Sequence, residues 1–130
     1  MTRIRNYKYS ILVALAIIIL STIPVPEVKP LEEVPLIDKW VHFLMYAALS
    51  ASMWLDRKLL RLPISASYFI LMFLLPSLLG GLLELVQAYL TTCRSGEWLD
   101  AVADAIGAVI GTVVCYFINL IWEKKTSTQR

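Results

Sequence analysis

Residues 99–122 read LDAVADAIGAVIGTVVCYFINLIW, and this stretch decides the class of the protein. Two aspartates near its start and one asparagine near its end interrupt a run that is otherwise apolar. A transmembrane helix needs ~20 mostly apolar residues, so this stretch is long enough to cross a bilayer. Three further apolar stretches precede it, at about residues 9–23, 38–55 and 64–90.

The composition of the whole chain agrees with a membrane protein. Of the 130 residues, 58% are hydrophobic and 17% are charged, and the mean hydropathy is +0.69. Soluble domains carry about 25% charged residues, which help to cover their surface. The chain has too few polar residues for a soluble enzyme domain, a nucleic-acid-binding module or a disordered tail. We therefore expect an all-α membrane protein, a single domain over residues 1–130, whose partners include the lipid bilayer but no nucleic acid.

The lysine and arginine positions predict how the four spans are oriented. Nine of the 12 Lys and Arg residues fall at the two ends of the chain or between the second and third stretches, and three fall in the other connections. Positive residues concentrate on the cytoplasmic side of membrane proteins. We predict a four-transmembrane-helix bundle with the N and C termini cytoplasmic and an uncleaved first helix. The tryptophans agree with this orientation, because Trp residues are enriched at membrane–water interfaces. Trp40 and Trp98 would lie at the outer interface, and Trp54 and Trp122 would lie at the inner one.

The third stretch, residues 64–90, is longer than a bilayer requires and contains Pro76. A proline inside a helix removes one backbone hydrogen bond and bends the helix. We therefore expect a long third helix that bends near Pro76.

A few ionisable residues interrupt the apolar stretches close to their outer ends. A charge at the bilayer centre costs at least ~3 kcal/mol on insertion scales, so such residues are paired, water-facing or functional. Glu84 and Asp104 should lie ~10 Å below the outer ends of their helices at 1.5 Å per residue. We expect no counterpart in the inner leaflet. We predict one outward-facing ligand-binding pocket, roofed by the loop that carries Arg94, and its other polar residues are Asp38, His42, Glu84, Gln87, Asp100 and Asp104.

Helical spacing places the polar residues of the last stretch on one face together with two glycines. Asp100, Asp104, Gly107 and Gly111 follow one another at helical intervals. A glycine pair at this spacing lets a neighbouring backbone approach closely. We therefore expect helix–helix packing through Gly107 and Gly111, within the chain or in an oligomer.

Each of these polar residues also has a structural explanation. Asp38 lies one turn before His42 and can orient its ring, and Asp100 can cap the fourth helix. Glu84 can make a structural hydrogen bond to Gln87 or Arg94. The catalytic candidates are Glu84 as a general acid or base and His42 or Asp100 as its partner. The spacing matches no metal-binding motif and no phosphate-binding loop is present, so we expect no metal and no cofactor.

The polar residues also form an ordered pattern along the chain. It comprises DKWVHF at residues 38–43 with Tyr46, then Glu84-x-x-Gln87, Arg94, Asp100 and Asp104-x-x-Gly107-x-x-x-Gly111. This pattern resembles the VanZ-like family of small bacterial membrane proteins, whose namesake is associated with resistance to the glycopeptide teicoplanin. The resemblance implies a multi-pass protein of the bacterial cytoplasmic (inner) membrane and selects the same seven polar residues. Asp104 departs from the pattern, because the family usually has Asn there.

Three functions follow from this pattern as hypotheses. The leading one is recognition of a lipid-linked or cell-wall-related envelope ligand, with Arg94 contacting an anion and with a link to glycopeptide resistance. The second is an integral-membrane hydrolase or transferase that acts on an envelope lipid. The third is a structural accessory subunit of a larger complex.

Overall fold

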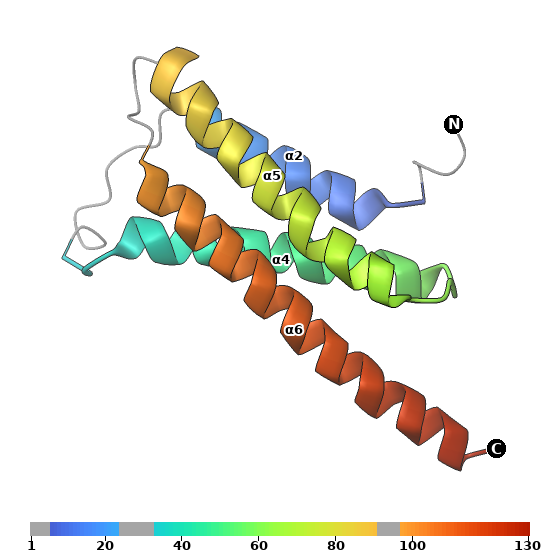
Figure 1. Ribbon diagram of the computed structural model, residues 1–130. Helices are drawn as coiled ribbons and strands as arrows, with labels where there is room; N and C mark the ends of the chain where they lie inside the picture. The colour runs from blue at the N-terminus through green and yellow to red at the C-terminus, as the bar shows by residue number, and fades with distance from the viewer. Residues whose placement is uncertain (1–5, 24–32, 91–96) are drawn as a thin grey trace.

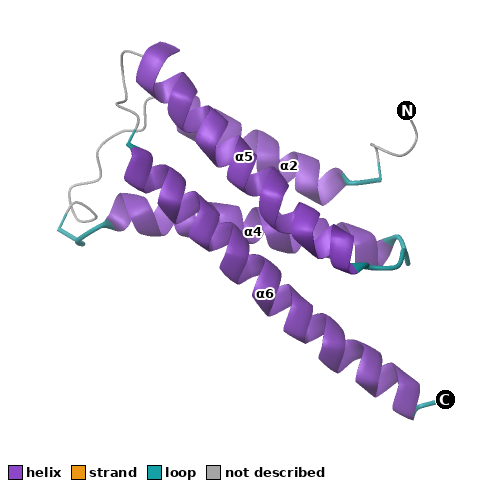
Figure 2. Cartoon of the chain, in the orientation of Figure 1, coloured by secondary structure: helices purple, strands orange, loops and turns teal. Residues whose placement is uncertain are grey.

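The computed structural model describes residues 6–23, 33–90 and 97–130. These residues form four helices, which are α2 (Lys8–Thr22), α4 (Ile37–Leu59), α5 (Ala66–Leu90) and α6 (Trp98–Thr128) (Figure 1). The described ranges contain no strand (Figure 2). Within the described ranges, the prediction of an all-helical structure with four long helices is therefore confirmed. The largest difference between the predicted and the observed helix bounds is at the end of α6, which was predicted at residue 122 and lies at Thr128.

Successive helices run in opposite directions (Figure 1). Hydrogen bonds between their ends show the pairing, and they join Ser10 to Asp56, Ser21 to Gln87, and His42 to Asp104. The first turns of α4 and α6 therefore meet the last turns of α2 and α5 at one end of the bundle. This end carries the polar residues that the sequence analysis singled out.

Two of the helices, α5 and α6, are long and apolar enough to cross a membrane by length and composition. Only 28% and 33% of their most apolar windows are buried inside the protein, whereas the core helix of a soluble protein is mostly buried. Large apolar side chains such as Leu78 and Ile121 are 67% and 68% exposed. Helix α2 has 15 residues and is shorter than a typical span, and α4 carries charged residues at both ends.

Helix α5 is a single helix that continues through Pro76. A proline has no N–H, so the carbonyl four residues earlier, that of Met72, loses its usual partner. The Ser50 hydroxyl of α4 donates a hydrogen bond to this carbonyl at 2.9 Å. Ser50 and Met72 are both fully buried. A neighbouring helix thus satisfies the backbone group that the proline frees, as buried helices in lipid require. The bend near Pro76 stays a prediction.

Helix α6 packs directly on the backbone of α4 through its two glycines. A Cβ atom added at Gly107 would overlap the carbonyl of Phe43, and one added at Gly111 would lie 2.7 Å from the carbonyl oxygen of Ala47. Neither position has room for a side chain. This close approach brings the first turns of α6 against the face of α4 that carries His42.

The opposite end of the bundle is held by Asp56, which the sequence analysis did not single out. Its carboxylate accepts hydrogen bonds from the backbone N–H groups of Tyr9 and Ser10 at 3.3 and 2.8 Å, and from the Ser10 hydroxyl at 2.6 Å. The first N–H groups of a helix have no partner within the helix, and the helix dipole favours a carboxylate there. Asp56 therefore caps α2 from a neighbouring helix. Because it is 1% exposed, the expectation of no buried ionisable residue at this end is wrong.

The glycine contact generates a test with a matched control in the same protein. We expect Gly107→Ala to lower the midpoint of thermal unfolding in detergent, because the new Cβ would push α6 away from Phe43. Gly81→Ala should leave it unchanged or raise it slightly, because a Cβ at Gly81 meets no atom within 4 Å and alanine is the better helix former. Equal loss of stability in the two variants would contradict close packing at Gly107.

Candidate functional site

Four residues at the polar end form what we call the lysine cluster, which contains Lys39, Asp38, Glu97 and Asp100. The Lys39 Nζ lies 2.5 Å from Asp38 Oδ2, 2.6 Å from Glu97 Oε2 and 2.7 Å from Asp100 Oδ1. The lysine side chain is 18% exposed, while those of Asp38 and Glu97 are about half-exposed. The cluster joins the first turn of α4 to the first turn of α6 at the rim of the bundle.

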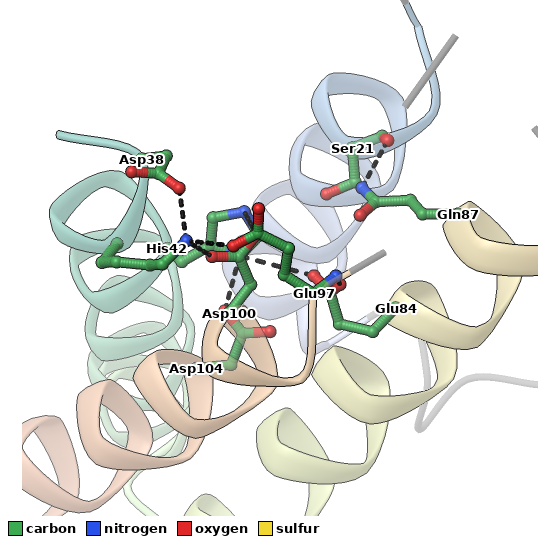
Figure 3. Close-up of polar contacts among 9 residues, drawn as sticks. Ser21, Asp38, His42, Glu84, Gln87, Glu97, Asp100 and Asp104 are labelled. Carbon is green, nitrogen blue, oxygen red and sulfur yellow. Dashed lines mark hydrogen bonds and ion pairs between the residues drawn. The ribbon is translucent and has the colours of Figure 1, made fainter. Parts of the chain in front are cut away.

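A second group lies deeper and forms the histidine cluster, which contains His42, Glu84, Asp100 and Asp104 (Figure 3). The His42 Nδ1 lies 2.8 Å from Asp104 Oδ1 and 4.0 Å from Glu84 Oε1, and its Nε2 lies 3.7 Å from Asp100 Oδ2. The four residues are at most 8% exposed, and Asp104 is 1% exposed. One imidazole from α4 thus faces three carboxylates from α5 and α6.

Backbone and amide groups position the parts of the site contributed by α5. The Glu84 Oε2 accepts a hydrogen bond from the backbone N–H of Glu97 at 2.9 Å, which ties α5 to the start of α6. The Gln87 amide donates to the carbonyl of Ser21 at 2.7 Å, so this side chain reaches toward α2 (Figure 3). Both residues are buried. Glu84 therefore belongs to the histidine cluster, and Gln87 lies at its edge.

The structural explanation considered for Asp38 does not describe its contacts, and the one considered for Asp100 describes only its place in the first turn of α6. Asp38 pairs with Lys39, and the His42 Nδ1 makes its hydrogen bond with Asp104 on another helix. The N-cap of α6 is Glu97, whose side chain makes no capping hydrogen bond. Asp100 lies in the first turn of α6, where the helix dipole favours a carboxylate, and it contacts both clusters.

The structure brings together five of the seven residues predicted for the site, namely Asp38, His42, Glu84, Asp100 and Asp104. Gln87 lies beside them, and Arg94 lies outside the described residues. That these residues bind a ligand stays a prediction. Sequence reasoning missed Lys39 and Glu97 as members of the site. Lys39 sits inside the DKWVHF segment, which was a usable signal, but it was counted only for orientation.

The histidine cluster is more closed than the hydrated pocket that the sequence suggested. Its four residues pack against one another and are almost completely buried. Only the lysine cluster offers substantially exposed carboxylates, those of Asp38 and Glu97. The site is therefore a buried polar network that reaches the surface at one end.

The charges of the two clusters do not balance. Five carboxylates face one lysine and one histidine among the residues that the structure describes. The Asp104 Oδ2 is buried and makes no hydrogen bond within the described part of the chain. A buried charge without a partner is costly, so bound protons, a bound cation or a basic residue outside the described ranges would have to compensate part of this negative charge.

Comparisons with protein-family models, with curated proteins and with solved structures found no match. The function is therefore argued from the geometry and the chemistry of the site.

Lys39 is expected to stabilise the fold by neutralising the carboxylates around it. Lys39→Met should lower the free energy of unfolding by ~1–3 kcal/mol, because it leaves the buried Asp100 without its cation. Asp100→Asn should restore part of this loss in the double variant. Chemical unfolding in detergent measures both effects. Lys124→Met, at the exposed end of α6, is the control and should change little. A Lys39→Met protein as stable as the wild type would show that the lysine cluster contributes nothing.

Proposed function

We propose that this chain is a VanZ-like, multi-pass protein of the bacterial cytoplasmic membrane, with four spans and both termini in the cytoplasm. Two helices of sufficient length and apolarity, with mostly exposed apolar windows, support the membrane location. The other two helices belong to the same bundle, in which α2 runs antiparallel to α4 and parallel to α5, and this supports four spans. The distribution of Lys and Arg supports the orientation, and the ordered polar pattern supports the family assignment.

In this arrangement the lysine and histidine clusters lie at the outer face, and we propose that they recognise a lipid-linked or cell-wall-related envelope ligand. One observation carries this proposal. Ionisable side chains from three different helices converge at a single end of the bundle and are buried there. Packing alone does not require such a costly arrangement, and ionisable residues inside a membrane mark functional sites by default. A link to glycopeptide resistance is part of the proposal and rests on the family resemblance.

The second candidate function is acid–base catalysis on an envelope lipid. The contact between His42 and Asp104 favours it, because a carboxylate that holds one ring nitrogen fixes the tautomer and the orientation of the imidazole. Glu84 lies near enough to the same ring to act as the second group. Conversion of an envelope lipid by the purified protein, lost in Glu84→Gln, would separate catalysis from binding.

The accessory-subunit reading has less support. It would use the small-residue face of α6 as the surface for a partner. Gly107 and Gly111 instead lie against the backbone of α4 in the same chain. We therefore do not propose this function.

The envelope function is tested in cells that lack the native gene and express variants. Glu84→Gln and Arg94→Ala should abolish the effect of the wild-type protein on teicoplanin sensitivity and on envelope stress, at equal amounts of protein in the membrane. His42→Gln should give the same loss through the buried end of the site. Glu123→Gln, at the far end of α6, is the control and should behave as the wild type. Wild-type behaviour of all three site variants would overturn the proposed function.

The orientation is tested with single cysteines. The background carries Cys93→Ser and keeps Cys115, which is buried and should not react. Single new cysteines then replace Glu33, before α4, or Ser127, at the end of α6. A membrane-impermeant maleimide should label Glu33→Cys in intact spheroplasts. It should label Ser127→Cys only after the membrane is permeabilised. The reverse pattern would invert the proposed topology, and labelling of both in intact spheroplasts would contradict the three spans proposed between these two positions.

A further inference from the structure

Three side chains of the histidine cluster bring together the ligand atoms of a metal site. His42, Glu84 and Asp104 each offer one atom, and these atoms all lie within 4.8 Å of one another. The His42 Nδ1 lies 2.8 Å from Asp104 Oδ1 and 4.0 Å from Glu84 Oε1. Ligands at ~2.1 Å from a tetrahedral zinc are separated by ~3.4 Å, which lies between these two distances. We propose that His42, Glu84 and Asp104 bind one divalent transition-metal ion.

The chemistry of the three donors fits such an ion. An imidazole suits zinc, copper, iron and nickel, and carboxylates are ligands of zinc and manganese. With a neutral ring and two ionised carboxylates, the set carries a charge that a divalent cation balances. Each ligand comes from a different helix, α4, α5 or α6, so the ion would join all three at the buried end of the site.

A second observation points to a missing ligand at the same place. The Asp104 Oδ2 is buried and has no hydrogen-bond partner within the described residues, and the residue is 1% exposed. This oxygen faces Gly80 of α5, where an added Cβ would lie only 2.6 Å from it. Gly80 is one helical turn before Glu84. The unpaired oxygen is therefore directed toward the α5 face that supplies the third ligand, where it can bind the ion itself or accept a hydrogen bond from water bound to the ion.

The lysine cluster is an internal contrast to this site. Asp38, Glu97 and Asp100 also bring three carboxylate oxygens together. The Lys39 ammonium lies within 2.7 Å of all three residues and already supplies their cation. His42, Glu84 and Asp104 have no lysine or arginine among their described ion pairs, and this difference is why we place the metal there.

The sequence analysis led to the expectation of no metal, because no local spacing matches a metal-binding motif. The three proposed ligands are separated by 42 and 20 positions along the chain, so local spacing carries no signal. A metal with three protein ligands keeps a position open for an outside group. It would also supply the positive charge that an acidic cluster needs in order to hold an anionic headgroup. The inference concerns the same residues as the proposed function, but metal binding can be measured without any envelope ligand.

The experiment uses the full chain, purified in detergent, freed of affinity tag and stripped of metal. Zn²⁺, Mn²⁺ and Co²⁺ are titrated separately by calorimetry, and bound metal is counted by mass spectrometry. We expect one ion of at least one of these metals per chain, with micromolar or tighter affinity. Bound Co²⁺ should give a visible spectrum of nitrogen and oxygen ligation without a thiolate band, which excludes binding by Cys93.

Variants assign the ligands. Glu84→Gln and Asp104→Asn should each weaken metal binding by at least ~10-fold. Even the loss of a residue that only hydrogen-bonds to a metal ligand lowers metal affinity by about 10–100-fold. His42→Gln should do the same. Asp38→Asn, which removes a carboxylate from the lysine cluster, is the matched control and should bind as the wild type. Each variant is compared with the wild type by thermal unfolding without metal, and metal should raise the midpoint only where the site is intact.

Two results would overturn the metal site. One is the absence of binding of all three metals to the wild type, and the other is equal binding by the wild type and Glu84→Gln. If a substitution prevents folding, the test rests on the wild type and Asp38→Asn alone. Metal should raise the unfolding midpoint of both proteins, and a midpoint that does not rise would contradict the metal site. If the protein binds no metal but the site variants lose the effect on teicoplanin sensitivity, the envelope function stands and the metal site does not. If the protein binds metal but the site variants behave as the wild type in cells, only the metal site stands.

Discussion

Helix α6 can lie against the backbone of α4 only because residues 107 and 111 have no side chains. Any Cβ at these positions would collide with the carbonyl groups of Phe43 and Ala47. The close approach sets the height of α6 relative to α4, and it places Asp104, three residues before Gly107, opposite His42. The polar site therefore depends on a packing contact that itself contains no polar side chain.

The same bundle satisfies several polar groups with partners from other helices. Ser50 bonds to the Met72 carbonyl freed by Pro76, and Asp56 caps the first turn of α2. Burial keeps water from these groups, and a buried polar group without a hydrogen bond is costly, so each needs a partner inside the protein. These contacts are complete, and we interpret them as structural. The histidine cluster differs, because its carboxylates outnumber its cations and one carboxylate oxygen stays unpaired within the described residues.

This contrast connects the two proposals. Lys39 neutralises the carboxylates at the rim, where Asp38 and Glu97 are half-exposed. Deeper in the bundle, burial makes uncompensated charge far more costly. A bound cation would remove that cost and would also give an acidic site the means to hold an anionic ligand. The excess of buried carboxylates is thus the feature that a structural role explains least.

The sequence by itself determined the four helices of the described residues and their approximate bounds, because apolar runs and helical spacing are local properties of the chain. It also selected Asp38, His42, Glu84, Asp100 and Asp104, since ionisable residues within apolar runs stand out without any structure. Only the tertiary structure decided which of them touch. The pairing of Lys39 with Glu97 and Asp100, the cap that Asp56 provides and the contact of His42 with Asp104 all join residues far apart in the chain. Such contacts follow from how helices pack, and no local pattern encodes them.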